Sequence, residues 1–282
     1  GYEKQEQFLS PRPVYQAMDR LVEARKDVDA AISVWGELIP ERMGDRIRYA
    51  TLKGSVLKRW DSIVDYVPVI SDLDIHICTI KDQPIFPHDR DGFRYALETT
   101  GLYEERFKEL RPGNIHIPRP QIVKMESNRE IWLPERTDDT LSLFGETPFR
   151  EEESEADCRK RDHEALMELD ARLKRMPGRI IDRIGLEYFR ILRELCYIVS
   201  PTPVRVLSQF TGSKKAWKMN RTHIILGLEG EGLTDLAISY RSYYYKGWEA
   251  FETGFKDNGI MRELIALAYD VLWRSHGIAK EI

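Results

Sequence analysis

The segment from Val67 to Ile80 constrains the fold more than any other part of the sequence. After Pro68 its aliphatic and β-branched residues alternate with polar ones, which is the pattern of a strand. Successive side chains of a strand point to opposite faces, so Asp72 and Asp74 share one face while Leu73 lies on the other. The sequence therefore predicts a sheet that carries two neighbouring carboxylates on one face and apolar side chains on the opposite face.

A second strand is predicted over Ile47 to Leu52, and it runs into a glycine–serine turn at Gly54 and Ser55. We expect a short helix over Val56 to Ser62 after this turn. Exposed backbone N–H groups, a hydroxyl and a helix N-terminus suit a phosphate group, and a glycine lets the backbone come close to an anion. Lys58, one turn into this helix, is a further candidate contact for phosphate oxygens.

The acidic pair predicts a metal site. Two adjacent carboxylates repel each other unless a cation offsets their charge, and oxygen ligands beside a polyphosphate favour Mg²⁺. Two such ions, bound by Asp72 and Asp74, can activate an attacking hydroxyl and stabilise leaving pyrophosphate, which usually requires a third acid from a neighbouring strand. Glu126, which ends a strand predicted over 121–126, is the candidate for this catalytic and metal-binding role. The alternative is an ordinary exposed glutamate at a strand end.

Helical periodicity surrounds these strands. Amphipathic helices are predicted over residues 14–35, 91–110, 181–199, 236–251 and 260–272, and a strand over 130–133 is expected to pair with 121–126. An acidic and polar stretch at 137–161 marks a domain boundary. We therefore expect an α+β fold: a domain over 1–150 with a small mixed sheet flanked by helices, and an all-helical domain over 151–282.

Composition excludes several classes of protein. The net charge of −4 provides no overall attraction to nucleic acid or to an anionic membrane surface. The apolar runs are far shorter than the roughly 20 residues that span a bilayer, and the first residues contain no apolar signal-peptide core. Three widely separated cysteines disfavour both a disulfide framework and a structural zinc site. These features predict a soluble cytoplasmic protein with no membrane partner.

The strand that ends in Gly54-Ser55, followed by Asp72-x-Asp74 on the next strand, resembles the signature of the DNA polymerase β-type nucleotidyltransferase superfamily. This resemblance covers residues 47–77. It implies a small mixed sheet in which the turn holds the triphosphate and the carboxylates hold metal. A helical domain that shapes the acceptor site, as in aminoglycoside nucleotidyltransferases, would be similar to the residues after 160. Sixteen residues separate Ser55 from Asp72, more than is usual in the motif, so an extended helix or loop is expected around 60–66.

The leading hypothesis is an enzyme that uses Mg²⁺, with two ions, to transfer AMP from ATP to a hydroxyl of an unidentified acceptor, which is a small molecule, an RNA or a protein. One alternative is an RNA-directed nucleotidyltransferase that acts on the 3′ end of tRNA or another RNA, and the net charge weakens it. Another is a non-catalytic nucleotide-binding module. His76 shares the face of the aspartates, but a structural histidine explains it as well. The basic and aromatic cluster at 214–221 is a candidate for binding phosphate or nucleic acid, or the exposed start of a helix.

Overall fold

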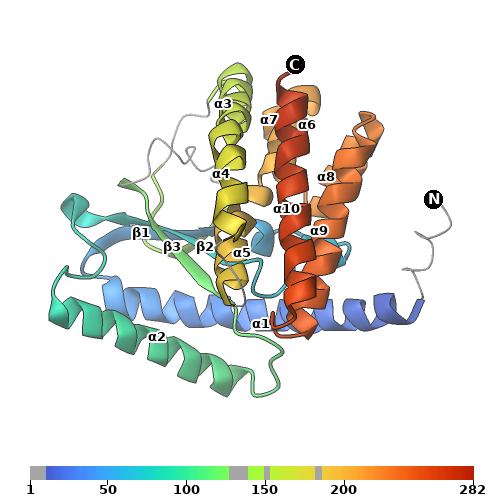
Figure 1. Ribbon diagram of the computed structural model, residues 1–282. Helices are drawn as coiled ribbons and strands as arrows, with labels where there is room; N and C mark the ends of the chain where they lie inside the picture. Colours follow the sequence, from blue (N-terminus) through green and yellow to red (C-terminus); the bar gives the residue numbers. More distant parts are fainter. Residues whose placement is uncertain (1–10, 127–138, 149–152, 182–185) are drawn as a thin grey trace. The chain divides into compact units, whose positions relative to one another are not determined.

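The chain forms two compact units. The computed structural model describes residues 11–126, 139–148, 153–181 and 186–282 (Figure 1). The first unit comprises Gly1–Arg59 and Ser71–Glu152, and the second comprises Trp60–Ile70 and Glu153–Ile282. The chain therefore passes between the units three times. An α+β architecture with a small mixed sheet and many helices is confirmed. None of the described helices is both long enough and apolar enough to cross a membrane.

The first unit contains a mixed sheet of four strands in the order β3-β2-β1-β4. The strands are β1 (Ile47–Lys53), β2 (Leu73–Thr79), β3 (Pro120–Lys124) and β4 (Leu141–Phe144). β1 pairs antiparallel with β2 and β4, whereas β2 pairs parallel with β3. β4 lies in the acidic stretch that was predicted to be a domain boundary. The expected strand over 130–133 lies outside the described residues.

One face of this sheet is apolar, as the alternation predicts. Leu73, Ile75 and Ile77 are completely buried. Figure 1 shows α1 (Pro11–Met43) and α2 (Arg90–Leu110) running side by side along the sheet. The two helices contact each other through the rings of Trp35 and Tyr103, whose centroids lie 5.0 Å apart. Both helices were predicted from their periodicity, and both are confirmed.

The helix predicted over 56–62 is wrong. The chain forms a single 3₁₀ turn, η3 (Ser55–Leu57), and becomes extended at Lys58. The reason lies on α1, where the guanidinium of Arg25 donates to the carbonyl oxygens of Val56 at 2.6 Å and Lys58 at 2.7 Å. An α-helix would use these carbonyls for its own backbone hydrogen bonds. A contact with a residue 31 positions away therefore replaces local helix formation.

The second unit is helical throughout its described residues after 153. Its helices are α3 (Glu155–Met167), α4 (Leu169–Ile181), α5 (Leu186–Val199), α6 (Thr202–Thr211), α7 (Ser213–Lys218), α8 (Arg221–Gly230), α9 (Thr234–Glu252) and α10 (Asn258–Ala279). The helices predicted over 236–251 and 260–272 are confirmed as α9 and α10. The helix predicted over 181–199 is replaced by the last residue of α4 and by α5, and residues 182–185 lie outside the description.

Residues 60–70, between β1 and β2, belong to the second unit. The indole Nε1 of Trp248 on α9 donates to the carbonyl oxygen of Ile63 at 2.8 Å. Val67 is completely buried, and Gly247 on α9 leaves so little room that an added Cβ would lie 2.7 Å from a methyl group of Ile70. The apolar residues before β2 are therefore used in the helical unit, which explains why the strand begins at Leu73 and not at Val67.

Asp65 fixes the conformation of this segment. Its carboxylate is almost completely buried and accepts hydrogen bonds from the backbone N–H groups of Asp61 at 2.7 Å and Ser62 at 3.1 Å. It also accepts from the backbone N–H and the hydroxyl of Thr222, each at 2.8 Å, at the start of α8. η4 (Ile63–Asp65) is thereby closed by a capping box. The long spacing between the turn and the acidic pair thus accommodates a loop docked on α8 and α9.

Candidate functional site

The structure brings the Gly54 turn against Asp74, one member of the acidic pair. In the antiparallel pairing of β1 with β2, Lys53 lies opposite Asp74. Gly54 follows with a φ of +91°, in the region that side chains disfavour. A Cβ added to Gly54 would lie 2.8 Å from Oδ2 of Asp74. Only glycine therefore permits the backbone to lie against this carboxylate.

The turn itself is smaller than the sequence predicts. The backbone N–H of Leu57 donates to the carbonyl of Gly54, and that of Lys58 donates to the carbonyl of Ser55, each at 3.2 Å. A three-residue 3₁₀ turn has no substantial helix dipole. An anion at this position would therefore depend on backbone N–H groups and on the Ser55 hydroxyl. Lys58, half-buried, closes the turn with extended backbone.

Asp72 and Asp74 are both half-buried. Asp74 lies within β2, on the face opposite Leu73 and Ile75, whereas Asp72 immediately precedes the strand. His76 is on the same face, completely buried and paired across the sheet with Thr51. The Asp72 carboxylate accepts a hydrogen bond from the guanidinium of Arg119, which immediately precedes β3. The acidic face therefore already carries one bound cationic side chain.

The register between β2 and β3 decides which residues lie beside the aspartates. Gln121 pairs with Asp74, and the backbone N–H of Leu73 donates to the carbonyl of Arg119 at 2.9 Å. An arginine and an amide therefore occupy the positions of the neighbouring strand closest to the acidic pair. Sequence reasoning missed both residues, because a strand's composition does not specify the register of parallel pairing.

The structure does not bring Glu126 to Asp72 and Asp74. Oε1 of Glu126 accepts hydrogen bonds from the backbone N–H of Thr79 at 2.5 Å and from the Thr79 hydroxyl at 3.2 Å, at the opposite end of β2. Glu126 lies five positions after Gln121, which corresponds to roughly 16 Å along a strand. β3 ends at Lys124, so Glu126 lies beyond the strand, away from the acidic pair.

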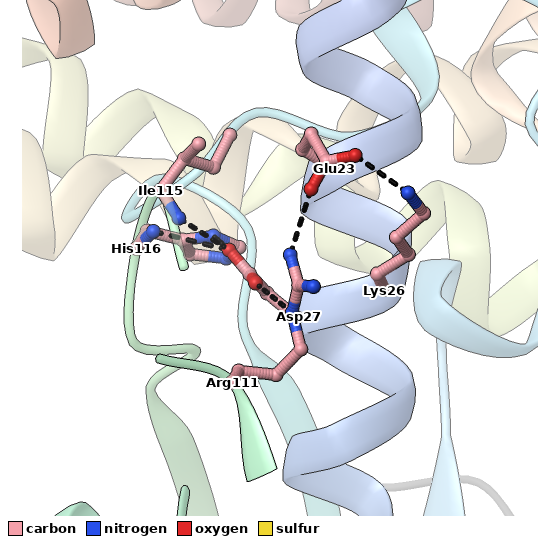
Figure 2. A network of polar contacts seen from close by, with 6 residues as sticks. All are labelled: Glu23, Lys26, Asp27, Arg111, Ile115 and His116. Atoms are coloured by element: carbon pink, nitrogen blue, oxygen red, sulfur yellow. Dashed lines mark hydrogen bonds and ion pairs between the residues drawn. The ribbon is translucent and has the colours of Figure 1, made fainter. Parts of the chain in front are cut away.

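A buried network on α1 holds the loop that leads to Arg119 (Figure 2). Oδ2 of Asp27 accepts hydrogen bonds from the backbone N–H groups of Ile115 at 2.9 Å and His116 at 3.1 Å, and Nδ1 of the His116 ring lies 3.1 Å away. Oδ1 accepts from Nε of Arg111 at 2.9 Å. The other end of this guanidinium binds Glu23 at 2.8 Å. This network fixes the path of residues 111–116.

Burial of Asp27 raises its pKa, but the hydrogen bonds from His116 and Arg111 lower it by more, so the net pKa lies below the ordinary carboxyl value. Farther along the loop, the Tyr103 hydroxyl donates to the carbonyl of Pro118 at 2.5 Å. The backbone that presents Arg119 is therefore held from both α1 and α2. Nothing in the local sequence around Asp27 indicates this role, since its partners lie 84 or more residues away.

The basic and aromatic cluster at 214–221 has structural partners. Arg221 is buried, lies 4.1 Å from the ring centroid of Tyr244, and donates to the carbonyls of Val64 and Asp65. Asn220 caps α8 by accepting from the backbone N–H of His223 at 2.9 Å. These contacts favour the helix-start interpretation of the cluster. The tyrosine run 243–245 likewise combines core and rim, with two rings completely buried and the third 38% exposed.

Across the part of the chain that the structure describes, no three histidine, cysteine or acidic side chains are grouped so that they could hold a metal ion. Asp72 and Asp74 thus form a pair without a third carboxylate. No protein-family model matches the sequence, and neither the curated proteins nor the solved structures give a match. The local geometry is therefore the basis for assigning a function.

Proposed function

We propose that the chain is a nucleotidyltransferase that binds a nucleoside triphosphate with Mg²⁺ at Gly54, Ser55, Asp72 and Asp74. The reaction would transfer a nucleoside monophosphate, AMP from ATP, to a hydroxyl of an acceptor. The observation that carries the proposal is the approach of the Gly54 backbone to the Asp74 carboxylate, 2.8 Å from the position of a Cβ. It supports the resemblance of residues 47–77 to the DNA polymerase β-type superfamily, because a phosphate-binding turn and a metal-binding acid must be adjacent.

Each residue of the proposed site has a role that follows from its chemistry. Gly54 provides backbone that a polyphosphate can approach closely, and the Ser55 hydroxyl is a hydrogen-bond donor beside it. Asp72 and Asp74 provide oxygen ligands of the kind that Mg²⁺ prefers. When bound, Mg²⁺ would supply charge stabilisation for the phosphoryl group in transfer. Asp72 and Asp74 fit a cation that is bound together with the nucleotide. Glu126 contacts Thr79 at the other end of β2 and is therefore too far away to contribute a third ligand.

One observation favours a second candidate function, a nucleotide-binding module without turnover. A catalytic site with two metal ions usually needs a third acid on the neighbouring strand, and here the residue paired with Asp74 is Gln121. The RNA-directed alternative gains no support from residues 214–221, because Asn220 and Arg221 are engaged in structural contacts.

The test is nucleotide turnover by the full chain and by Asp74→Asn. We expect the variant to lose at least about a hundredfold in transfer of labelled AMP from ATP to small-molecule, RNA and protein acceptors, because it loses a metal ligand. Asp45→Asn is the matched control, since Asp45 is exposed in the turn before β1 and its loss removes the same charge. Control activity should equal that of the wild type.

Equilibrium binding of a fluorescent ATP analogue, measured with Mg²⁺ and with EDTA, separates the two candidate functions. Binding that requires Mg²⁺ and Asp74, without turnover on any acceptor class, selects the non-catalytic module. A wild-type chain that binds no nucleotide under either condition rules out both candidates.

A further inference from the structure

A positively charged side chain of the protein itself, that of Arg119, lies beside the acidic pair. Arg119 binds the Asp72 carboxylate, and its side chain is 39% exposed while that of Asp72 is 15% exposed. The backbone of Arg119 is fixed by the hydrogen bond between its carbonyl and the N–H of Leu73 at 2.9 Å. The preceding residue is fixed by Tyr103 and the loop by Asp27. Hydrogen bonds along residues 115–119 therefore fix the backbone that places the guanidinium beside Asp72.

The charges at the site do not match a pair of divalent ions. Three carboxylates and two divalent ions nearly balance, with −3 against +4. Here, before any nucleotide binds, two carboxylates and the Arg119 guanidinium leave −1, and Lys53, opposite Asp74 across the strands, adds a further positive charge. Glu126 is bound at the other end of β2. A second divalent ion would be added to a site where Arg119 already occupies Asp72, and like charges at short range repel. The residues present thus disagree with an arrangement of two metal ions.

We infer that Arg119 supplies the second positive charge of this site and that the site consequently admits no more than one divalent cation. The inference deepens the proposed function and rests on it for the nucleotide, but the number of bound cations can be measured on the protein alone. The contact that Arg119 makes in the structure is with Asp72, so we assign it the role of a charge-balancing residue. Its role is visible in the affinity for cations.

The experiment counts Mn²⁺ bound to the full chain by electron paramagnetic resonance, without nucleotide and with a non-hydrolysable α,β-methylene analogue of ATP. We expect no more than one ion per chain attributable to Asp72 and Asp74, identified as the signal lost in the Asp72→Asn/Asp74→Asn double variant. In Arg119→Gln the acidic pair should bind Mn²⁺ about fivefold or more tightly, or take up an additional ion, because a neighbouring positive charge is gone. Arg94→Gln, at an exposed position of α2, should match the wild type.

The outcomes separate this inference from the proposed function. Two ions attributable to the pair in the wild type, or an unchanged Mn²⁺ affinity in Arg119→Gln, would overturn the inference. No ion at all, together with tighter Mn²⁺ binding in Arg119→Gln, supports the role of Arg119 and contradicts the Mg²⁺-dependent function. If Arg119→Gln fails to fold, Arg119→Lys and the wild-type count still decide. The lysine variant keeps the charge and should keep the wild-type count.

Discussion

Two connecting segments lead to the strands of the candidate site, and each is held by a buried aspartate in a different way. Residues 111–116 precede β3 and are held by Asp27, which lies on another element and has charged partners. Residues 60–70 precede β2 and are held by Asp65, which lies within the segment and, among the described residues, accepts hydrogen bonds from backbone N–H groups and a hydroxyl. The Arg221 guanidinium nearby binds the carbonyl oxygens of the segment and not this carboxylate. The hydrogen bonds to a buried carboxylate can therefore come from charged groups or from neutral donors. Removing the Asp27 carboxylate should therefore lower stability more than removing that of Asp65. The stabilisation by Asp27 should also decrease at acidic pH.

The largest effect is expected at the charged anchor. Asp27→Asn removes the negative charge facing Arg111 and places an amide N–H₂ where two backbone N–H groups donate, so we expect the loop to lose about 3 kcal/mol of local stability. Hydrogen exchange at the amides of Ile115 and His116 measures this loss. Glu23→Gln, in the exposed part of the same network, should change these rates much less. Equal effects of the two variants would contradict a special role for the buried carboxylate.

The pH dependence of this anchor sharpens the comparison. The folded pKa of Asp27 is below its unfolded value, because hydrogen bonds from His116 and Arg111 outweigh the effect of burial. Its stabilisation is therefore complete above the ordinary carboxyl pKa of about 4 and is lost as pH falls through the lowered folded value. Stability measured across this acid range should decline less in Asp27→Asn than in the wild type. Parallel declines would show that other carboxylates dominate.

A smaller effect is expected at the neutral anchor. Asp65→Asn turns one accepting oxygen into a donor against backbone N–H groups, which should cost about 2 kcal/mol. Exchange of the Thr222 amide, which donates to this carboxylate, is the measurement. Asp61→Asn offers a matched control, since Asp61 is partly exposed and accepts from the Asn220 side chain. A loss larger than that of Asp27→Asn would reverse the ranking of the two anchors.

The smallest effect is expected where a single neutral hydrogen bond supports the segment. Trp248→Phe removes the donor to the carbonyl of Ile63, and we expect a loss of about 1 kcal/mol from this bond. Thermal unfolding is compared with that of Trp273→Phe, the same substitution at a position of α10 that is 57% exposed. Because Trp248 is buried, lost packing adds to the loss of the hydrogen bond. Identical shifts in Tm for the two variants would show that the bond to Ile63 contributes nothing.

Local patterns predicted the parts of the site that depend on local geometry. Alternation predicted the strand that carries Asp74, and the glycine–serine pair identified the turn at the end of β1. Helical periodicity likewise predicted α1, α2, α9 and α10. These features depend on residues within a few positions of one another, so their physical causes are readable along the chain.

Long-range contacts explain what could not be predicted. The helix after Ser55 is absent because Arg25 takes the carbonyls that it would need. Glu126 lies away from the acidic pair because the register of β3 on β2 places Gln121 opposite Asp74. The loop that leads into β3 is held by Asp27, whose partners are 84 or more positions away. The sequence around one residue of such a contact does not indicate which distant residue is its partner.

The membership of residues 60–70 in the second unit has a consequence for dissecting the protein. A fragment ending near residue 150 would retain Val64, Tyr66 and Val67 but lose the helices among which they are packed. In such a fragment the apolar segment between β1 and β2 would be exposed to water. Neither unit is a single continuous stretch of sequence, so neither can be excised or transferred to another protein as one piece of the gene.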